Sequence, residues 1–188
     1  YWGNNILNTA PFDGNSNWYW ASAGKTLTAL MVGIAQEDGL LSIENSSTIY
    51  LGNGWTSLTA EQEGLIKIKH QLTMTTGLDY QVVNLNCTDP DCLSYKNTPG
   101  TNWFYHNATY SLLKDVIENA TETSYNEFTN QKVKIKIGMG GSWIQLNNSD
   151  TYYSTARDMA RFGLLILNEG VWDEDVILND TNYFSNMV

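Results

Sequence analysis

The fold of this chain is decided by the stretch Ser22–Ala35, which reads SAGKTLTALMVGIA. Its apolar residues recur with the i, i+3, i+4, i+7 spacing of a helix that buries one face. They are Leu27, Leu30, Met31, Ile34 and Ala35. Gly39 follows as a helix stop. The pattern therefore predicts a core helix that begins at Ser22 and ends before Gly39.

Ser22 and Lys25 lie one turn apart on the same face of this predicted helix. A neutral lysine in that position can accept the serine's proton and turn the hydroxyl into an acylating nucleophile. The amides and the positive dipole at a helix start favour a developing oxyanion. The ordinary alternative is a capping serine followed by a solvated lysine. A phosphate-binding loop is disfavoured because Tyr19 stands where that motif needs glycine.

A second motif spans residues 99–113, which read PGTNWFYHNATYSLL. A Pro-Gly turn leads through an aromatic stretch to the corner Tyr105-His106-Asn107, and a helix pattern follows. We expect its inward residues to be Leu112, Leu113, Val116, Ile117 and Ala120. A phenol and a carboxamide two positions apart can relay a proton and hold a substrate carbonyl. The alternative is a core tyrosine and a helix-capping asparagine.

Together the two motifs resemble those of the serine β-lactamase and penicillin-binding-protein superfamily, and of its class C β-lactamase-like branch in particular. That branch includes family VIII esterases, D-stereospecific peptidases and nylon-oligomer hydrolases. Three further stretches fit the resemblance, which runs from about Trp20 to the end of the chain. They are IKIKHQLTMTTGL at 66–78, IGM at 137–139 and YSTARDMARFG at 153–163.

The resemblance implies a role for each matching residue. Ser22 is the acylated nucleophile, while Lys25 and Tyr105 form the acid and base pair without a single assigned base. Asn107 orients the substrate amide or ester. His106, between the two matched positions, is also placed among the substrate-binding residues, although strand-like alternation can point it away from the cleft. Neither a metal nor a cofactor is implied.

The resemblance also implies an α+β fold like that of β-lactamases and DD-peptidases, as a single domain over residues 1–188. The family's third motif, Lys-Thr-Gly or His-Thr-Gly on a core strand, does not occur in this sequence. We therefore expect a piece that lacks both ends of a larger enzyme. It would hold mostly the helical portion, with part of the antiparallel sheet missing, and its own activity is an open question.

Composition narrows the class of partner. Twenty acidic and ten basic residues give a net charge of −10, which disfavours nucleic acid and anionic membrane surfaces. No apolar run is long enough to span a bilayer. We expect a small-molecule or peptide-like substrate. The resemblance suggests a secreted or periplasmic bacterial protein, and we interpret the six Asn-x-Ser/Thr sequons as a result of the Asn, Ser and Thr content.

Cys87 and Cys92 enclose a short polar loop, and their spacing suits a disulfide, with free surface thiols as the alternative. A metal site would need more ligands than this loop and the two histidines offer. Farther along, residues 154–168 predict a capped amphipathic helix that ends at Gly170. Its expected inward residues are Met159, Phe162, Leu165 and Ile166. Its charged residues Arg157, Asp158 and Arg161 are expected to be structural or solvated.

The favoured function is a serine hydrolase that cleaves an amide, β-lactam or ester bond through an acyl-enzyme on Ser22. The alternative is a non-catalytic relative that recognises penicillin-like ligands, or a structural relative that binds a partner. A Ser-His-Asp hydrolase is disfavoured because no Gly-x-Ser-x-Gly elbow occurs. Aromatic residues near the motifs, Trp18, Trp20, Trp103 and Tyr105, suggest an apolar acyl group or belong to the core.

Overall fold

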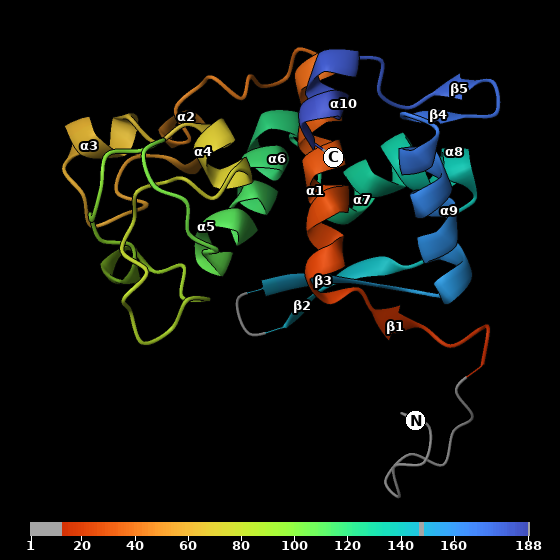
Figure 1. Ribbon diagram of the computed structural model, residues 1–188, viewed down its shortest axis with the longest axis horizontal. Coiled ribbons are helices and arrows are strands. Elements are labelled where there is room, and N and C mark those ends of the chain that lie inside the picture. Colours follow the sequence, from red (N-terminus) through yellow and green to blue (C-terminus); the bar gives the residue numbers. More distant parts are fainter. Residues whose placement is uncertain (1–12, 147–148, 188) are drawn as a thin grey trace, which may run out of the picture.

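The computed structural model describes residues 13–146 and 149–187. Its helices surround one central helix, and a small antiparallel sheet crosses the lower end of that helix (Figure 1). The helical elements are η1 Ala21–Ala23, α1 Gly24–Glu37, α2 Thr48–Leu51, α3 Ala60–Gly64, α4 Ile68–Leu72, η2 Pro90–Cys92, α5 Asn107–Ser111, α6 Leu113–Thr121, α7 Tyr125–Thr129, η3 Asn130–Lys134, α8 Ile135–Ile137, α9 Ala156–Leu167 and α10 Thr181–Met187. The strands are β1 Trp18–Tyr19, β2 Ser142–Leu146, β3 Ser149–Ser154, β4 Val171–Trp172 and β5 Asp175–Val176.

Helix α1 forms the centre of the core, as its apolar spacing predicts. All five residues expected to face inward are buried. Four of them are fully buried, namely Leu27, Leu30, Met31 and Ala35. Helices α6 and α10 pack against α1. The helix ends at Glu37, and Gly39 adopts a φ of +74°, the left-handed conformation expected of a glycine stop.

The main sheet has three antiparallel strands in the order β1-β3-β2. Strand β1 pairs Trp18 with Ser154 and Tyr19 with Tyr153, so it joins the sheet directly before η1 and α1. The second sheet is the small β4-β5 hairpin. Helices together with small antiparallel sheets confirm the predicted α+β class.

The helix predicted after the tyrosine corner is present as two pieces, α5 and α6, which meet at Leu112. Leu112, Leu113, Val116 and Ile117 are buried as predicted, and Ala120 is partly buried against the same core. The loop before this helix is closed by a disulfide between Cys87 and Cys92, which resolves the alternative left by their spacing.

Helix α9 differs from its prediction in two places. It begins at Ala156, two residues after the predicted start, because Ser154 ends β3 and Thr155 supplies the capping box with Asp158. Met159 was expected to face inward but is 40% exposed, so that prediction is wrong. Phe162 and Leu165 already fill the buried stripe of the helix.

Asp158 of α9 has a structural role, as expected for the charged residues of this helix. Its carboxylate accepts hydrogen bonds from the Thr155 backbone amide and hydroxyl and from the Gly140 amide, and it lies 3.6 Å from Arg161. Burial raises the pKa of Asp158, but these hydrogen bonds and the arginine outweigh it, so the pKa lies below its ordinary value.

Candidate active site

Ser22 lies at the junction between sheet and core helix. It is exposed, and it belongs to the turn η1, between β1 and α1. Buried Trp20 anchors this junction, because its backbone amide donates to Tyr152 O at 2.8 Å and its indole to Ser154 Oγ at 2.8 Å. The serine is therefore presented to solvent by a fixed segment of backbone.

Ala21, directly before Ser22, has a φ of +47°. A residue with a Cβ adopts this left-handed conformation at a cost of about 1–3 kcal/mol, and such strain concentrates at functional sites. The strained turn carries the chain from β1 into α1 and sets the direction of the serine side chain. Sequence reasoning missed this residue because nothing distinguishes an alanine in that conformation from any other alanine.

Tyr105 meets the serine across 83 positions of sequence: its phenol donates a hydrogen bond to Ser22 Oγ at 2.7 Å. The loop that carries it is pinned on both sides, by Phe104 N donating to Met74 O and by Ala108 N donating to Leu85 O. The fold thus brings the two predicted catalytic hydroxyls into direct contact.

The pKa of the Tyr105 phenol reflects two opposed effects. Burial raises it, but the hydrogen bonds with Ser22 and Lys25 and the positive charge of Lys25 outweigh burial and bring the pKa below the ordinary value of 10. The phenol is therefore easier to deprotonate than a tyrosine in water, as a proton acceptor for Ser22 should be.

Lys25 lies between two aromatic rings. Its Nζ is 5.3 Å from the centre of the Tyr105 ring and 5.7 Å from that of Tyr110, within the range of cation–π contacts. The Tyr110 hydroxyl also donates to the Lys25 backbone oxygen at 2.8 Å. Sequence reasoning gave Tyr110 no role, although it lies within the motif at residues 99–113, in the helix after the tyrosine corner.

Asn107 is the first residue of α5 and is half-buried. Its Oδ1 is enclosed and has no hydrogen-bond partner within the described part of the chain. An enclosed amide oxygen without a partner is poised to accept an N–H from a bound molecule, because leaving it unpaired is costly. The substrate-orienting role of Asn107 stays a prediction.

His106 is not brought to the serine. Its side chain is only 3% exposed, and its Nε2 lies 3.3 Å from the backbone oxygen of Asp79. The ring faces the loop around residue 79 because the extended backbone at His106 alternates sides, with Tyr105 on the exposed side. We therefore correct the prediction that His106 binds substrate directly.

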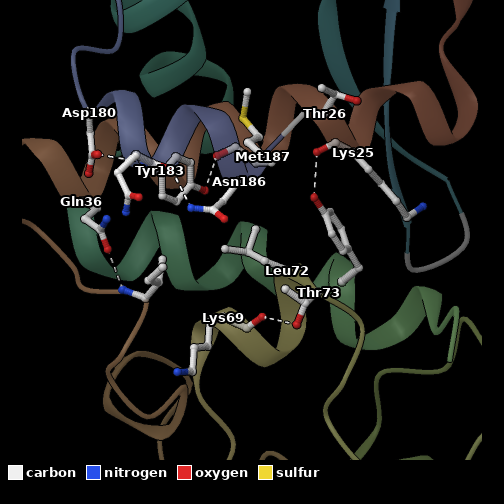
Figure 2. Close-up of a pocket in the computed structure, with 14 residues that line it drawn as sticks. Lys25, Thr26, Gln36, Lys69, Leu72, Thr73, Asp180, Tyr183, Asn186 and Met187 are labelled. Atoms are coloured by element: carbon white, nitrogen blue, oxygen red, sulfur yellow. Dashed lines mark hydrogen bonds between the residues drawn. The ribbon is translucent and has the colours of Figure 1, made fainter. Parts of the chain in front are cut away.

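One cavity adjoins the site and has Lys25 in its lining (Figure 2). It has a volume of about 430 Å³ and lies between α1, α4 and α10, where Leu72, Tyr183 and Met187 supply apolar lining. Figure 2 shows the Lys25 side chain extending away from the α10 residues, and neither Ser22 nor Tyr105 lines the cavity.

A smaller polar hollow of about 30 Å³ adjoins Lys25 on the side of the β2-β3 hairpin. Lys114 and Asp150 line it, with their charged atoms 3.6 Å apart. Burial raises the pKa of Asp150, and the nearby Lys114 opposes that change. The charged groups nearest to Lys25 on this side are thus partly neutralised by each other.

Residues 13–146 and 149–187 hold no group of three or more His, Cys, Asp or Glu side chains that could bind a metal ion. No helix among them is both long and apolar enough to span a lipid bilayer.

The aromatic residues near the motifs divide into two kinds. Trp20 is 4% exposed and belongs to the core, whereas Trp18 and Trp103 are 49% and 66% exposed. Trp18, Trp103 and Tyr105, which is 38% exposed, therefore remain as candidates for contact with an apolar substrate group.

Comparisons with known proteins agree with this arrangement. Penicillin-binding protein 4* of Bacillus subtilis (strain 168) is 30% identical over 146 residues, which are 69% of this chain and 31% of that protein. The ML-236A carboxylate methylbutanoyltransferase of Penicillium citrinum is 24% identical over 75% of this chain and 40% of its own length. The chain thus spans less than half the length of these two relatives.

Solved structures show the same fold. A penicillin binding protein from Bacillus halodurans superposes with a TM-score of 0.73 at 19% identity, over 96% of this chain and 67% of that one. A β-lactamase/D-alanine carboxypeptidase from Pseudomonas syringae gives a TM-score of 0.70 at 20% identity, over 93% of this chain and 56% of that one. The expected β-lactamase-like fold is confirmed. Because the model of the Beta-lactamase family also matches residues 1–185, the chain belongs to that family, within the superfamily of serine β-lactamases and penicillin-binding proteins.

Proposed function

We propose that this chain carries the acylating centre of a serine hydrolase, with Ser22 as nucleophile and with Tyr105 and Lys25 as its proton-transfer pair. The observation that carries the proposal is the 2.7 Å hydrogen bond between the Tyr105 phenol and Ser22 Oγ, with the Lys25 ammonium 5.3 Å from the tyrosine ring. A nucleophile, a base in contact with it and a cation that favours the deprotonated base are the parts that acyl transfer needs.

The proton path follows from these contacts. Ser22 Oγ attacks the carbonyl carbon of the substrate while its proton passes to the pair formed by Tyr105 and Lys25. The tetrahedral intermediate collapses when the bond to the leaving amine or alcohol breaks and the pair returns the proton to that group. Water then attacks the carbonyl carbon of the Ser22 ester and gives a proton to the pair. The ester bond breaks as the pair returns that proton to Ser22 Oγ, which releases the acid product and restores the free serine.

Two further features of the site have a place in this proposal. The start of α1 directs its positive dipole end toward the junction that carries Ser22, which favours the oxyanion of the tetrahedral intermediate. The enclosed Oδ1 of Asn107 accepts an N–H of the substrate, which favours amides and lactams that carry such a group.

For the substrate we propose an amide, β-lactam or ester with an apolar group next to the reacting carbonyl. Trp103 supports this choice because it is 66% exposed and stands two residues before Tyr105. A large apolar side chain so near the reacting hydroxyls gains free energy when a substrate group covers it. The Cys87–Cys92 disulfide supports a secreted or periplasmic location, because disulfides persist in oxidising compartments.

The test is covalent labelling with a fluorophosphonate probe, combined with hydrolysis of p-nitrophenyl butyrate. Ser22→Ala should abolish both signals, and Ser185→Ala, which removes an exposed serine of α10, should change neither. The experiment uses both the 188-residue chain and any longer natural polypeptide that contains it.

Each outcome has one meaning. Labelling of Ser22 in either polypeptide supports the proposal, and labelling in the longer one alone means that residues outside this chain complete the site. If the probe labels neither polypeptide while both bind a β-lactam reversibly, the non-catalytic binding function replaces the proposed one.

A further inference from the structure

His106 is a buried titratable group between the two residues that the proposed chemistry uses most. Exposure alternates along its segment, since Trp103 and Tyr105 are 66% and 38% exposed whereas His106 is 3% exposed. The ring therefore lies on the opposite side of the backbone from the Tyr105 phenol. One stretch of extended backbone therefore carries the His106 ring and the Tyr105 phenol on opposite sides.

The contacts of the ring determine which nitrogen carries the proton. Its Nε2 lies 3.3 Å from the backbone oxygen of Asp79, and a carbonyl oxygen can only accept a hydrogen bond. The proton of the neutral ring is therefore on Nε2. The other nitrogen, Nδ1, is enclosed and has no partner among the described residues, so it suits a lone pair better than an N–H.

The segment that His106 contacts is itself held firmly. The Asp79 carboxylate pairs with Lys96 Nζ at 2.8 Å, and the same Nζ lies 4.2 Å from the centre of the Tyr80 ring. Tyr80 in turn stacks on Phe104, with ring centres 4.0 Å apart. The loop around residue 79 thus forms a fixed support against which the His106 ring rests.

We propose that His106 is a positioning residue, which in its neutral Nε2–H form binds the Asp79 carbonyl and so holds Tyr105 against Ser22, and that protonation of the ring releases this hold. The inference rests on the function proposed above and adds a pH-dependent control of that site. His106 acts only through its neighbours and contacts neither substrate nor the reacting atoms.

The charges around His106 support a neutral ring at physiological pH. Burial lowers the pKa of His106, and the hydrogen bond to Asp79 and the Asp79 charge oppose that change without cancelling it. Asp79 is moreover paired with Lys96, which reduces its pull on a protonated ring. A second proton would place an N–H on Nδ1, where no acceptor lies within the described residues. The His106 ring therefore holds Tyr105 in place at pH values above the His106 pKa. The hold is lost as the pH falls through that pKa, which lies below the ordinary 6.5.

Nitrogen-15 NMR tests the ring directly and without any catalysis. The chain has two histidines, His70 and His106, so the signals that disappear in His106→Gln belong to His106. We expect the shifts of an Nε2–H tautomer and a titration midpoint below 6.5. An Nδ1–H tautomer, or a midpoint at or above 6.5, would overturn the inference.

Kinetics test the consequence for the site. His106→Gln keeps an amide donor but does not titrate, so it should retain kcat within about threefold and lose the acid limb of the pH profile. His106→Leu keeps the volume but not the donor, and its kcat at pH 8 should fall about tenfold with little change in KM. His70→Gln, the matched control, should keep the wild-type profile.

The two proposals fail in different ways. If the hydrolase proposal is wrong, wild-type Ser22 is not labelled, and the tautomer and midpoint still decide whether His106 is held as described. If the inference is wrong, an active enzyme keeps its acid limb in His106→Gln. Thermal melting of each variant separates a loss of positioning from a loss of fold, because the inference predicts lower kcat at pH 8 for His106→Leu but not for His106→Gln, with the melting temperature unchanged in both.

Discussion

Removal of the Tyr105 hydroxyl is the sharpest perturbation that the site allows. Tyr105→Phe deletes the oxygen that lies 2.7 Å from Ser22 Oγ and leaves the ring, which is 38% exposed, in place. The ground state loses one exposed hydrogen bond, worth about 0.5–1.5 kcal/mol at most. The effect on binding and stability should therefore be small.

The effect on the reaction should be much larger. General acid and base catalysis contributes about 10²- to 10⁴-fold, and a hundredfold loss corresponds to about 2.7 kcal/mol of transition-state stabilisation. We expect kcat to fall at least about a hundredfold while KM changes only a few fold, since the hydroxyl acts mainly in the transition state. The assay is steady-state hydrolysis of p-nitrophenyl butyrate in parallel with the rate of fluorophosphonate labelling.

The pH profile adds a second readout. Because the pKa of Tyr105 lies below 10 and the deprotonated form accepts the proton of Ser22, labelling by wild type should rise with pH with a midpoint below pH 10. Tyr105→Phe should remove that step. Tyr95→Phe, which removes the hydroxyl of another exposed tyrosine, should retain both rate and profile. A Tyr105→Phe variant within tenfold of the wild-type kcat would refute the reasoning.

Three predictions concern stability. Gly77→Ala should lower the free energy of unfolding by about 1–3 kcal/mol, because φ is +76° there and a Cβ would collide with the backbone oxygen of Asn97. Urea unfolding measures this as a lower midpoint, and an unchanged midpoint contradicts the prediction. Asp158→Asn should cost about 0.5–2 kcal/mol near pH 7 through the weakened helix cap. Since the folded-state pKa of Asp158 is depressed, that contribution is present above its unfolded pKa and is lost as pH falls through the folded value, so wild type and variant should converge in acid thermal melts. Replacing Cys87 and Cys92 together by Ala should cost about 2 kcal/mol for a loop this short, and reduction of wild type should reproduce the loss in melting temperature.

Periodicity predicted the core helix and the helix after the tyrosine corner well, because burial of one face imposes a spacing that can be read without coordinates. The core positions of α1 and the inward residues of the α5-α6 pair were expected and are buried. Met159 shows the limit of this method: it continues the apolar stripe of α9, but Phe162 and Leu165 occupy the buried face. Spacing locates a stripe, and only packing decides how wide it is.

The candidate site was predicted as a set of residues rather than as a geometry. Ser22, Lys25, Tyr105 and Asn107 stood out through two motifs, while Ala21 carried no signal at all. His106 was assigned the wrong kind of role, because the side of an extended segment that faces a cleft depends on its partner strand or loop. The contact with Asp79 that holds His106 lies 27 positions away in sequence.

The sequence by itself determined the core helix through its apolar spacing, and its two motifs carried the resemblance that implied the fold class and the residues proposed to react. The tertiary structure alone decided that the Tyr105 phenol meets Ser22 across 83 positions and that Lys25 lies beside the rings of Tyr105 and Tyr110. The physical reason is that local propensities set which residues share a helix face, whereas long-range contacts depend on how all the faces pack together.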